Sequence, residues 1–581
     1  MRPARFVASF IVALLLAHAS LASAAEFFDE VQGSPLGSNA DWTNYLRLDD
    51  LDGDGDLDVV VPNCGGFFAN PQAQPFRVHR NDGKGKLVES PDMLGGSFSA
   101  PIRVVDLGDI DGDGDLDLFA PSAAGTPDRL FINDGKGSFT DEAASRIGTS
   151  SRSAGVRFLD VDGDGDLDLV VGAGYAKAEP VPARLYLNDG KGSFAEAPGK
   201  LPAVGPNDVD DVDAFDADRD GDLDLLLMSH GGKPALWFND GAGNFNDASS
   251  NLGTDAPGLK YGPTACDVDG DGDLDLWLDN AGPNYTEALL VNDGSGHFVE
   301  ETASRVVGNP GADDNGVVCA DVDLDGDFDA IVASLSDVER VLLNDGTGHF
   351  TNAAGFTAIG DSTLWLDVGD LDGDGRLDAV TGQGESGDFR NRVYLGGVDN
   401  PADARPPEVV LPTLPGMLGS GQSVAVRFQV SDRVLVDAGP RVRAELRVSI
   451  DGAAPAVIPA RFVGGDLFQA TLVGVPGVSI VVEACAVDAR ANEGCSMKQT
   501  LQGPGTAAAT SSASSASGGA GGGSAGAGGG AGGEGGATAS EPADGGCGCR
   551  IAGPSRERPS GAGRFFVAAL ALALARRRRS G

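Results

Sequence analysis

The sequence of 581 residues predicts an all-β chain: a seven-bladed β-propeller, then an Ig/fibronectin-like β-sandwich, a disordered Gly/Ala/Ser linker and a short C-terminal apolar segment. Three observations lead to this prediction. An aspartate-rich motif recurs seven times, an Asn-Asp-Gly motif recurs between its copies, and short strand-like segments flank both. A repeat of about 50 residues with four short strands is typical of a propeller blade.

A secretory signal peptide is expected at residues 1–24. Two arginines precede an apolar run there, and the small residues 22–24 suit cleavage. The mature chain would then be exported.

The aspartate motif follows the pattern D-x-D-x-D-G-x-x-D. Closely spaced carboxylates repel one another unless a cation joins them. Calcium accepts six to eight oxygen ligands in a flexible shell, whereas zinc would need Cys or His at ligand spacing and magnesium suits an all-oxygen protein cage less well. We therefore expect about seven calcium sites, one for each copy of the motif. The copies begin at Asp50, Asp109, Asp160, Asp216, Asp267, Asp321 and Asp370.

The second motif, N-D-G-x-G-x-F, is expected to form the turn of a β-hairpin, because Asn, Asp and Gly accept positive φ. It appears at Asn81 (with Leu87 in place of Phe), Asn133, Asn188, Asn239, Asn292 and Asn344. Each unit then contains four strands, with both motifs on one rim of the ring and the variable loops between the second and third strands on the other. In the second unit the strands are expected at 102–107, 116–121, 128–132 and 138–143.

The last unit stops after its third strand, and the N-terminal sequence "EFFDEVQGS" resembles that of a fourth strand. We expect Glu26 to Val31 to complete the seventh blade and close the ring, which would remove an exposed sheet edge.

Residues 26–397 resemble FG-GAP/VCBS repeats, the calcium-loop blades of the integrin α-subunit propeller and of many bacterial surface proteins. The resemblance implies that motif positions one, three, five and nine supply side-chain ligands and that position seven supplies a main-chain carbonyl. Integrin-like ligand recognition is not expected, because the sequence contains neither D-x-S-x-S nor Arg-Gly-Asp. The metal-site residues are Asp50, Asp52, Asp54, Asp56 and Asp58; Asp109, Asp111, Asp113, Asp115 and Asp117; Asp160, Asp162, Asp164, Asp166 and Asp168; Asp216, Asp218, Asp220, Asp222 and Asp224; Asp267, Asp269, Asp271, Asp273 and Asp275; Asp321, Asp323, Asp325, Asp327 and Asp329; and Asp370, Asp372, Asp374, Arg376 and Asp378.

The sequence after the propeller (25–397) divides into segments of different composition. A Pro-rich linker at 398–407 leads to alternating strand-like text at 408–502, which predicts the sandwich. Residues 503–546 are almost pure Gly, Ala and Ser and lack the apolar content to pack.

The cysteines fall into two groups. Cys485 and Cys495 flank the turn "DARANEG", so an exported chain is expected to join them in a disulfide. Cys64, Cys266 and Cys319 lie in the blades and are expected to be buried apolar thiols, with no pairing assigned.

Residues 547–581 contain Cys547 and Cys549, an apolar run and four arginines. This ending resembles the MYXO-CTERM sorting signal of myxobacterial surface proteins. The resemblance implies cleavage near one of the two cysteines, which would remain as the anchor at the cell surface or outer membrane. A small disulfide hairpin beside a marginal membrane anchor is the alternative interpretation, and release from the cell stays open.

The sequence favours a non-enzymatic calcium-binding surface protein in adhesion or in glycan or protein recognition. Its net charge of −44 excludes nucleic acid and anionic membranes as partners, apart from the C-terminal anchor. We expect a monomer. No histidine is paired with a nucleophile in a known motif, but a secreted propeller enzyme acting on polysaccharide is the alternative.

The partner face is expected on the rim of variable loops, where Phe67, Phe68, Tyr175 and Tyr285 lie.

If the tail is a sorting signal, the mature surface protein should end near Cys547 or Cys549 and lack the arginines 576–579. Mass spectrometry of surface-extracted protein tests this directly. Deleting residues 547–581 should release the protein into the medium, whereas an intact arginine block on mature protein would contradict the assignment.

Overall fold

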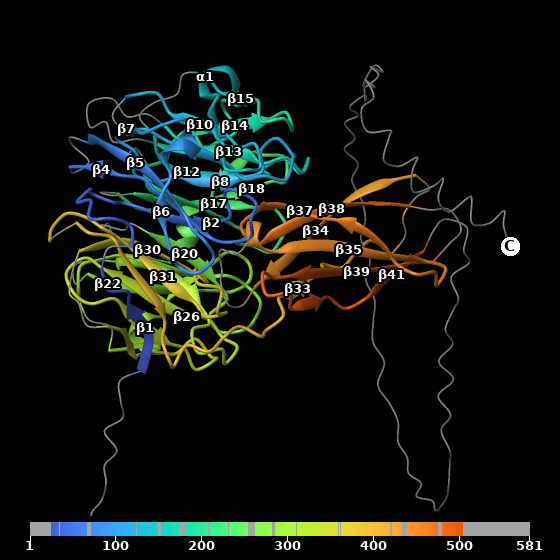
Figure 1. The fold of residues 1–581 in the computed structure, drawn as a ribbon. Coiled ribbons are helices and arrows are strands. Elements are labelled where there is room, and N and C mark those ends of the chain that lie inside the picture. Colours follow the sequence, from blue (N-terminus) through green and yellow to red (C-terminus); the bar gives the residue numbers. More distant parts are fainter. Residues whose placement is uncertain are drawn as a thin grey trace, which may run out of the picture. The chain divides into compact units, whose positions relative to one another are not determined.

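The computed structural model describes residues 25–502, except 34, 67–70, 124, 149–152, 174–181, 207–208, 230–231, 254–261, 282–284, 309–310, 358–359, 361, 388, 417, 419–420, 433–438 and 475–478. The predicted signal peptide, Gly/Ala/Ser linker and sorting tail lie outside these residues. Strands dominate the described part. In Figure 1 the strands of residues 25–396 are coloured from blue to yellow, and those of residues 408–502 form an orange group.

Seven sheets, numbered here in chain order, cover residues 25–396. Sheets 1 to 3 consist of β2 (Arg47–Asp49), β3 (Asp58–Val61), β4 (Cys64–Gly65), β5 (Gln72–Arg80), β6 (Val88–Glu89) and β7 (Phe98–Ala100); β8 (Asp106–Gly108), β9 (Asp117–Ala120), β10 (Arg129–Ile132) and β11 (Thr140–Asp141); and β12 (Ser153–Leu159), β13 (Asp168–Ala173), β14 (Arg184–Asn188) and β15 (Phe194–Glu196). Sheets 4 to 6 consist of β16 (Val209–Phe215), β17 (Asp224–Ser229), β18 (Ala235–Asn239) and β19 (Phe245–Asp247); β20 (Pro263–Cys266), β21 (Asp275–Ala281), β22 (Thr286–Asn292) and β23 (Phe298–Glu300); and β25 (Asp314–Ala320), β26 (Asp329–Ser334), β27 (Arg340–Leu343), β28 (Phe350–Asn352) and β24 (Val306–Val307).

Sheet 7 consists of β30 (Thr363–Gly369), β31 (Asp378–Gln383), β32 (Arg392–Gly396), β1 (Ala25–Glu30) and β29 (Ala354–Phe356). Short helical turns occur at α1 (Ala143–Arg146), α2 (Thr302–Arg305), η1 (Pro91–Leu94), η2 (Ser249–Leu252) and η3 (Gly439–Arg441).

The predicted unit of four consecutive strands is confirmed in sheet 2, where β8 to β11 pair as an antiparallel meander. The ladders are shorter than expected. Of the predicted first strand, 102–107, only Asp106 and Leu107 lie in β8, and Ile102 contributes one isolated bridge to Ser122.

The N-terminal strand β1 pairs antiparallel with β32, with Phe28 opposite Gly396 and Glu30 opposite Tyr394. Burial of an apolar side chain drives this closure, because Phe28 is 1% exposed and stacks on Phe356 at 4.5 Å between ring centroids. The pairing is the one predicted from the sequence. The parallel contact between β1 and β29 was not predicted.

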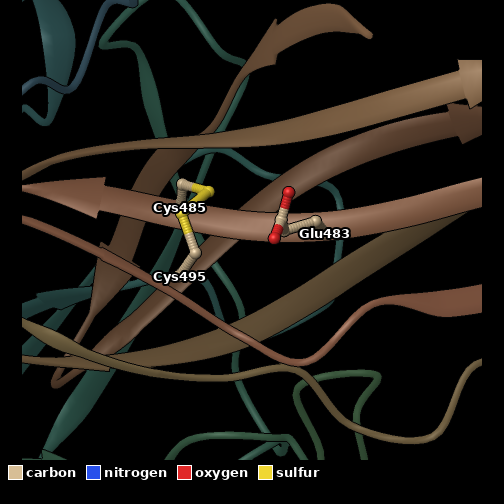
Figure 2. A group of neighbouring side chains, drawn as sticks. All are labelled: Glu483, Cys485 and Cys495. Atoms are coloured by element: carbon tan, nitrogen blue, oxygen red, sulfur yellow. A yellow bond between two sulfur atoms is a disulfide. The ribbon is translucent and has the colours of Figure 1, made fainter.

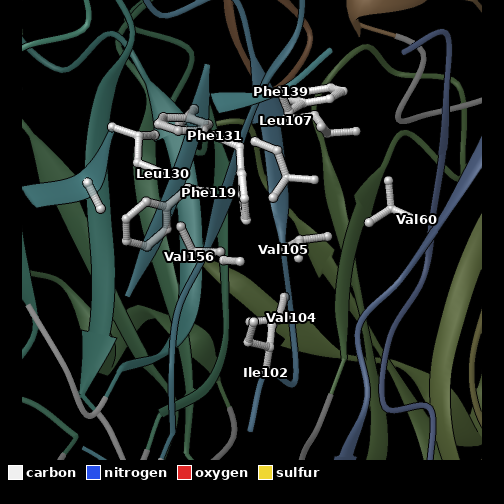
Figure 3. Close-up of a cluster of buried hydrophobic side chains, with 14 of the residues drawn as sticks. Val60, Ile102, Val104, Val105, Leu107, Phe119, Leu130, Phe131, Phe139 and Val156 are labelled. Atoms are coloured by element: carbon white, nitrogen blue, oxygen red, sulfur yellow. The ribbon is translucent and has the colours of Figure 1, made fainter. Parts of the chain in front are cut away.

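The core lies between neighbouring sheets. Branched and aromatic side chains of sheets 1 to 3 meet there, among them Leu107, Phe119, Phe131 and Phe139 (Figure 3). Phe139 is the aromatic residue of the N-D-G-x-G-x-F motif, and burial of this position explains why the motif ends in a large apolar residue.

The turn asparagine ties six of the seven sheets, all but sheet 7, to the sheet before it. The side-chain amide of Asn133 donates to the carbonyl oxygen of Leu116 in its own sheet at 3.1 Å and to that of Leu51 in the preceding aspartate loop at 3.0 Å. The same contact with the preceding loop recurs from Asn188 to Ile110, Asn239 to Val161, Asn292 to Ala217, Asn344 to Val268 and Asn81 to Leu371.

Residues 408–502 form a second all-β part with two antiparallel sheets around one apolar core, which includes Phe428, Leu446 and Ile480. One sheet contains β33 (Glu408–Val410), β34 (Ser423–Ser431), β38 (Leu467–Val473) and β37 (Arg461–Gly464); the other contains β36 (Ala456–Pro459), β35 (Arg443–Ile450), β39 (Ser479–Val487), β40 (Glu493–Cys495) and β41 (Gln499–Gln502). This arrangement is a β-sandwich.

Two disulfides occur among the described cysteines. Cys485 and Cys495, the pair expected from the sequence, are joined across β39 and β40 (Figure 2). The expectation for Cys266 and Cys319 was wrong, because these residues are disulfide-bonded across β20 and β25 rather than free thiols. They are 53 residues apart, about one repeat, and neighbouring sheets bring such positions together. Cys64 is a free, buried thiol.

Replacing Asn133 by Ala should destabilise the fold by about 2 kcal/mol, because two buried carbonyl groups each lose a donor. Chemical denaturation measures this loss. Asn244 is a matched control, since its exposed side chain bonds only to Asp240 of its own turn and Asn244→Ala should change the unfolding free energy by less than about 0.5 kcal/mol. Equal losses in both variants would contradict the linking role of Asn133.

Candidate metal centres

Each aspartate motif forms the loop between the first and second strands of its sheet, and the loops are numbered here like the sheets. In loop 3, carboxylate oxygens of Asp160, Asp162 and Asp168 all lie within 4.8 Å of one another. Oxygens that bind one calcium ion at about 2.3–2.6 Å are at most about 5 Å apart. The spacing therefore suits calcium. Similar groups form from Asp50, Asp52 and Asp58; Asp109, Asp111 and Asp113; and Asp216, Asp218 and Asp224.

The loops are held in shape by hydrogen bonds to the first aspartate. Asp160 accepts the backbone N–H of Gly163 at 2.8 Å and that of Gly165 at 2.9 Å, one on each carboxylate oxygen. Both glycines have positive φ. In loops 4 and 6 the fourth position is Arg219 or Leu324, and these residues adopt the same left-handed conformation, with φ of 61° and 55°.

The loop aspartates are named here by motif position, so the third aspartate is the one at position three of each loop. In most of the loops it has an oxygen with no partner. In five loops its Oδ1 atom is buried and has no hydrogen-bond partner among the described residues; these are Asp52, Asp111, Asp162, Asp218 and Asp269. Buried polar atoms are nearly always paired, and an unpaired carboxylate oxygen costs free energy. A recurring orphan oxygen beside other carboxylates therefore fits a cation ligand.

The aspartate at motif position nine, called here the ninth aspartate, accepts structural hydrogen bonds and is also a candidate metal ligand. Asp168 accepts the backbone N–H of Asn188 at 2.8 Å and that of Val161 at 3.1 Å, so it joins the loop to the N-D-G turn. Burial nevertheless raises the pKa of Asp168 to about 8, against the opposing effect of these bonds. A divalent cation would favour the charged form.

The other six ninth-position carboxyls behave in the same way. Burial is again the main cause, and it raises the pKa to about 7 for Asp58, Asp117 and Asp378 and to about 8 for Asp224, Asp275 and Asp329.

The seventh-position side chain packs on the N-D-G turn. A Cβ atom added to Gly190, whose φ is 69°, would collide with the carboxylate of Asp166. This close approach explains why the turn needs glycine. In loop 7 the seventh position is Arg376, and its Cβ lies against Gly396. The carbonyl ligand assigned to this position stays a prediction.

A further group of possible metal ligands does not form a metal site. Glu483, Cys485 and Cys495 lie close together, but the two sulfur atoms are bonded to each other and offer no thiolate (Figure 2).

The described histidines lack the surroundings of a catalytic base. His79 is buried, and burial lowers its pKa to about 4. His297 lies 3.2 Å from the hydroxyl of Ser295 in an exposed turn, but that hydroxyl donates to Asp293 at 2.6 Å. Ser362, in the sequence "GDS", is 1% exposed.

A cavity of about 330 Å³ is lined by residues of the propeller-type sheets and of the sandwich, including Arg157, Asp213 and Trp365. Within it, Arg157 lies 3.5 Å from Asp213. The lining also contains Arg47 and the carboxylates of Asp267, Asp271, Asp327, Asp367, Glu408 and Asp466. Acidic groups therefore outnumber basic groups in this cavity.

Of the aromatic residues predicted for the partner face, Tyr285 is 42% exposed. Phe67, Phe68 and Tyr175 lie outside the described residues, as do Cys547 and Cys549. Within the described part of the chain, no helix is long and apolar enough to cross a membrane.

The comparisons with known proteins agree with the repeat pattern. The FG-GAP-like repeat matches residues 50–120, 122–171, 216–278 and 321–381, and the FG-GAP repeat matches 154–191. No curated protein matches the chain.

Three solved structures are similar at low identity. They are BBS1N in complex with ARL6DN (10% identity, TM-score 0.40, 65% of this chain and 100% of that one), the V. cholerae biofilm matrix protein Bap1 (16%, 0.31, 82% and 75%) and Saccharomyces cerevisiae Sqt1 (11%, 0.40, 64% and 99%). The family matches show that the chain contains FG-GAP repeats, and these repeats together with the seven sheets of residues 25–396 indicate a propeller-type fold.

Proposed function

We propose that this protein is a calcium-stabilised, non-enzymatic protein of the cell surface that recognises an extracellular glycan or protein. The observation that carries the calcium assignment is the buried, unpaired Oδ1 of the third aspartate, which recurs in five of the seven loops. Calcium prefers oxygen ligands, and each loop offers them from alternate residues.

Positions one, three, five and nine of each loop would hold the ion through their side chains, and position seven would hold it through its carbonyl. Bound calcium would supply the positive charge that these carboxylates lack. The backbone bonds to Asp160 and Asp168 favour this role, because they fix both ends of the loop before any ion arrives.

A non-enzymatic role is favoured over polysaccharide hydrolysis. Hydrolysis needs two carboxyl groups at a site that substrate can reach. In this proposal the loop carboxylates hold calcium, and Asp213 in the cavity of about 330 Å³ is paired with Arg157.

The partner face is proposed to be the rim opposite the aspartate loops. The loop rim is partly covered, because the backbone N–H of Asp160 donates to the carbonyl of Val463 in the sandwich at 2.8 Å. The opposite rim carries exposed aromatic surface at Tyr285, which could stack on a sugar or pack on a protein.

Export and surface anchoring complete the proposal. They depend on the signal peptide at 1–24 and on the tail with Cys547 and Cys549. The net charge of −44 is consistent with a protein that stays soluble outside the cell and contacts a membrane only through its anchor.

Removing calcium with a chelator should lower the melting temperature of the mature protein by about 10 °C or more, because each site contributes about 2.7 kcal/mol at a hundredfold excess of ion over Kd. Calcium should restore the transition and magnesium should do so only weakly. Calorimetry with and without chelator measures this, and an unchanged melting temperature would rule out the calcium assignment.

Two variants locate the ions, counted by native mass spectrometry. Asp162→Ala removes an orphan oxygen and should reduce the bound calcium by one ion. Arg376→Ala is the control, because position seven is expected to bind through its carbonyl, and this variant should keep the full number.

Tyr285→Ala should weaken partner binding at least about tenfold without changing calcium uptake, because a buried aromatic anchor contributes about 2 kcal/mol or more at an interface. A glycan array first identifies the ligand, and titration of wild type and variant then compares affinities. Unchanged binding by Tyr285→Ala would place the partner elsewhere.

A further inference from the structure

Arginines lie at the carboxylates of all seven aspartate loops, and they come from two sources. In loops 1, 2 and 5 they come from β5, α1 and α2 of the propeller-type part and approach the third aspartate. The pairs are Arg80 with Asp52 at 2.8 Å, Arg146 with Asp111 at 3.6 Å and Arg305 with Asp269 at 3.2 Å.

In loops 3, 4, 6 and 7 arginines arrive from beyond residue 397 and approach the first or seventh position. Arg427 of β34 pairs with both Asp160 and Asp222 at 2.8 Å. The other pairs are Arg461 with Asp166 at 3.0 Å, Arg405 with Asp321 at 3.7 Å and Arg490 with Asp370.

Arg427 is the most deeply placed of this second group. Its side chain is 11% exposed, and Asp160 is fully buried. Gln469 accepts a hydrogen bond from its Nε at 2.9 Å, which fixes the guanidinium plane. The two terminal nitrogens then reach separate loops, one donating to Asp160 and the other to Asp222 and to the carbonyl of Gly221. One side chain thus serves two candidate metal centres.

The sandwich does not depend on Arg427 alone for its position. Val463, at the tip of the β37–β38 hairpin, is fully buried in a cluster with Leu159 and Leu223 and accepts the N–H of Asp160. Leu467 belongs to the same cluster. A variant that loses the charge of Arg427 should therefore fold and keep the two parts together.

At loop 3 the guanidinium and a calcium ion would be attracted by the same carboxylate, that of Asp160. At loop 4 the guanidinium pairs with the side chain of Asp222, whose main-chain carbonyl is the expected ligand. In both loops the two cations would repel each other. At separations of a few ångström in a largely buried site this repulsion is not screened by salt. Each cation must therefore lower the affinity of the loop for the other, and the effect is reciprocal.

We propose that Arg427 is a tethered competitor of calcium at loops 3 and 4. Its positive charge lowers the calcium affinity of both loops together and neutralises part of their carboxylate charge when calcium is scarce. This inference rests on the proposed calcium sites. It gives the sandwich a function in setting the affinity of the loop rim.

Hydrogen–deuterium exchange with mass spectrometry tests the proposal on the mature chain, because peptides covering each loop report separate calcium midpoints. In Arg427→Met the midpoints of loops 3 and 4 should fall about tenfold, the range expected for coupling between neighbouring sites. Those of loops 1 and 5, which have their own arginines, should not move.

Two variants serve as controls. Arg447→Met removes a positive charge of the sandwich that pairs only with Glu445 and Glu493 of the sandwich, and it should leave all midpoints unchanged. Arg427→Lys keeps the charge and should stay within about threefold of wild type, as expected for a coupling dominated by charge.

The outcomes separate the two proposals. Midpoints of loops 3 and 4 that are unchanged or higher in Arg427→Met would overturn the competitor role, as would an equal shift in every loop or a lysine variant that behaves like methionine. A wild-type protein in which calcium protects none of the loops would instead refute the calcium sites themselves.

Discussion

Repulsion among carboxylates is the constraint on which the rest of this structure depends. Six loops each place five aspartates within nine residues, and the seventh places four. Several kinds of protein group partly compensate for this negative charge. Backbone N–H groups donate to the first and ninth aspartates, and arginines approach the third, first or seventh. In five loops the third aspartate still has a buried oxygen without a hydrogen-bond partner among the described residues. The calcium ion that we propose would supply the positive charge that these oxygens lack.

The loops are also mechanically connected. Asn188 donates from its side chain to Ile110 in the preceding loop, while its own N–H donates to Asp168. Every N-D-G turn thus joins two aspartate loops. If the proposed ions bind, their binding is expected to be cooperative with folding, because each loop helps to position its neighbour.

Local patterns in the sequence predict the local structure well. Strand-like segments, Asn-Asp-Gly turns and a repeat of about 50 residues were sufficient to predict the four-stranded unit. The likeness of the N-terminal sequence to that of a fourth strand was sufficient to predict the pairing of β1 with β32. Contacts between units could not be predicted. The Cys266–Cys319 disulfide joins residues one repeat apart, and Arg427 meets Asp160 across 267 residues, so neither leaves a short-range signal. The hydrogen bond from the side-chain amide of the turn asparagine to the preceding loop could likewise not be predicted, since turn propensity alone explained the presence of the asparagine.

The two rims of the ring therefore face different physical demands. The loop rim must gather charge, and it is partly closed by the sandwich, where the buried Val463 fits between the sheets and Arg427 reaches the carboxylates. The opposite rim carries the loops between second and third strands, whose lengths vary freely because they do not enclose a charged centre. Stabilisation and recognition can then evolve separately. Under the proposed assignments, a substitution among the variable loops would leave the charge of the aspartate loops unchanged, whereas a substitution of Arg427 would change ion affinity without altering the proposed partner face.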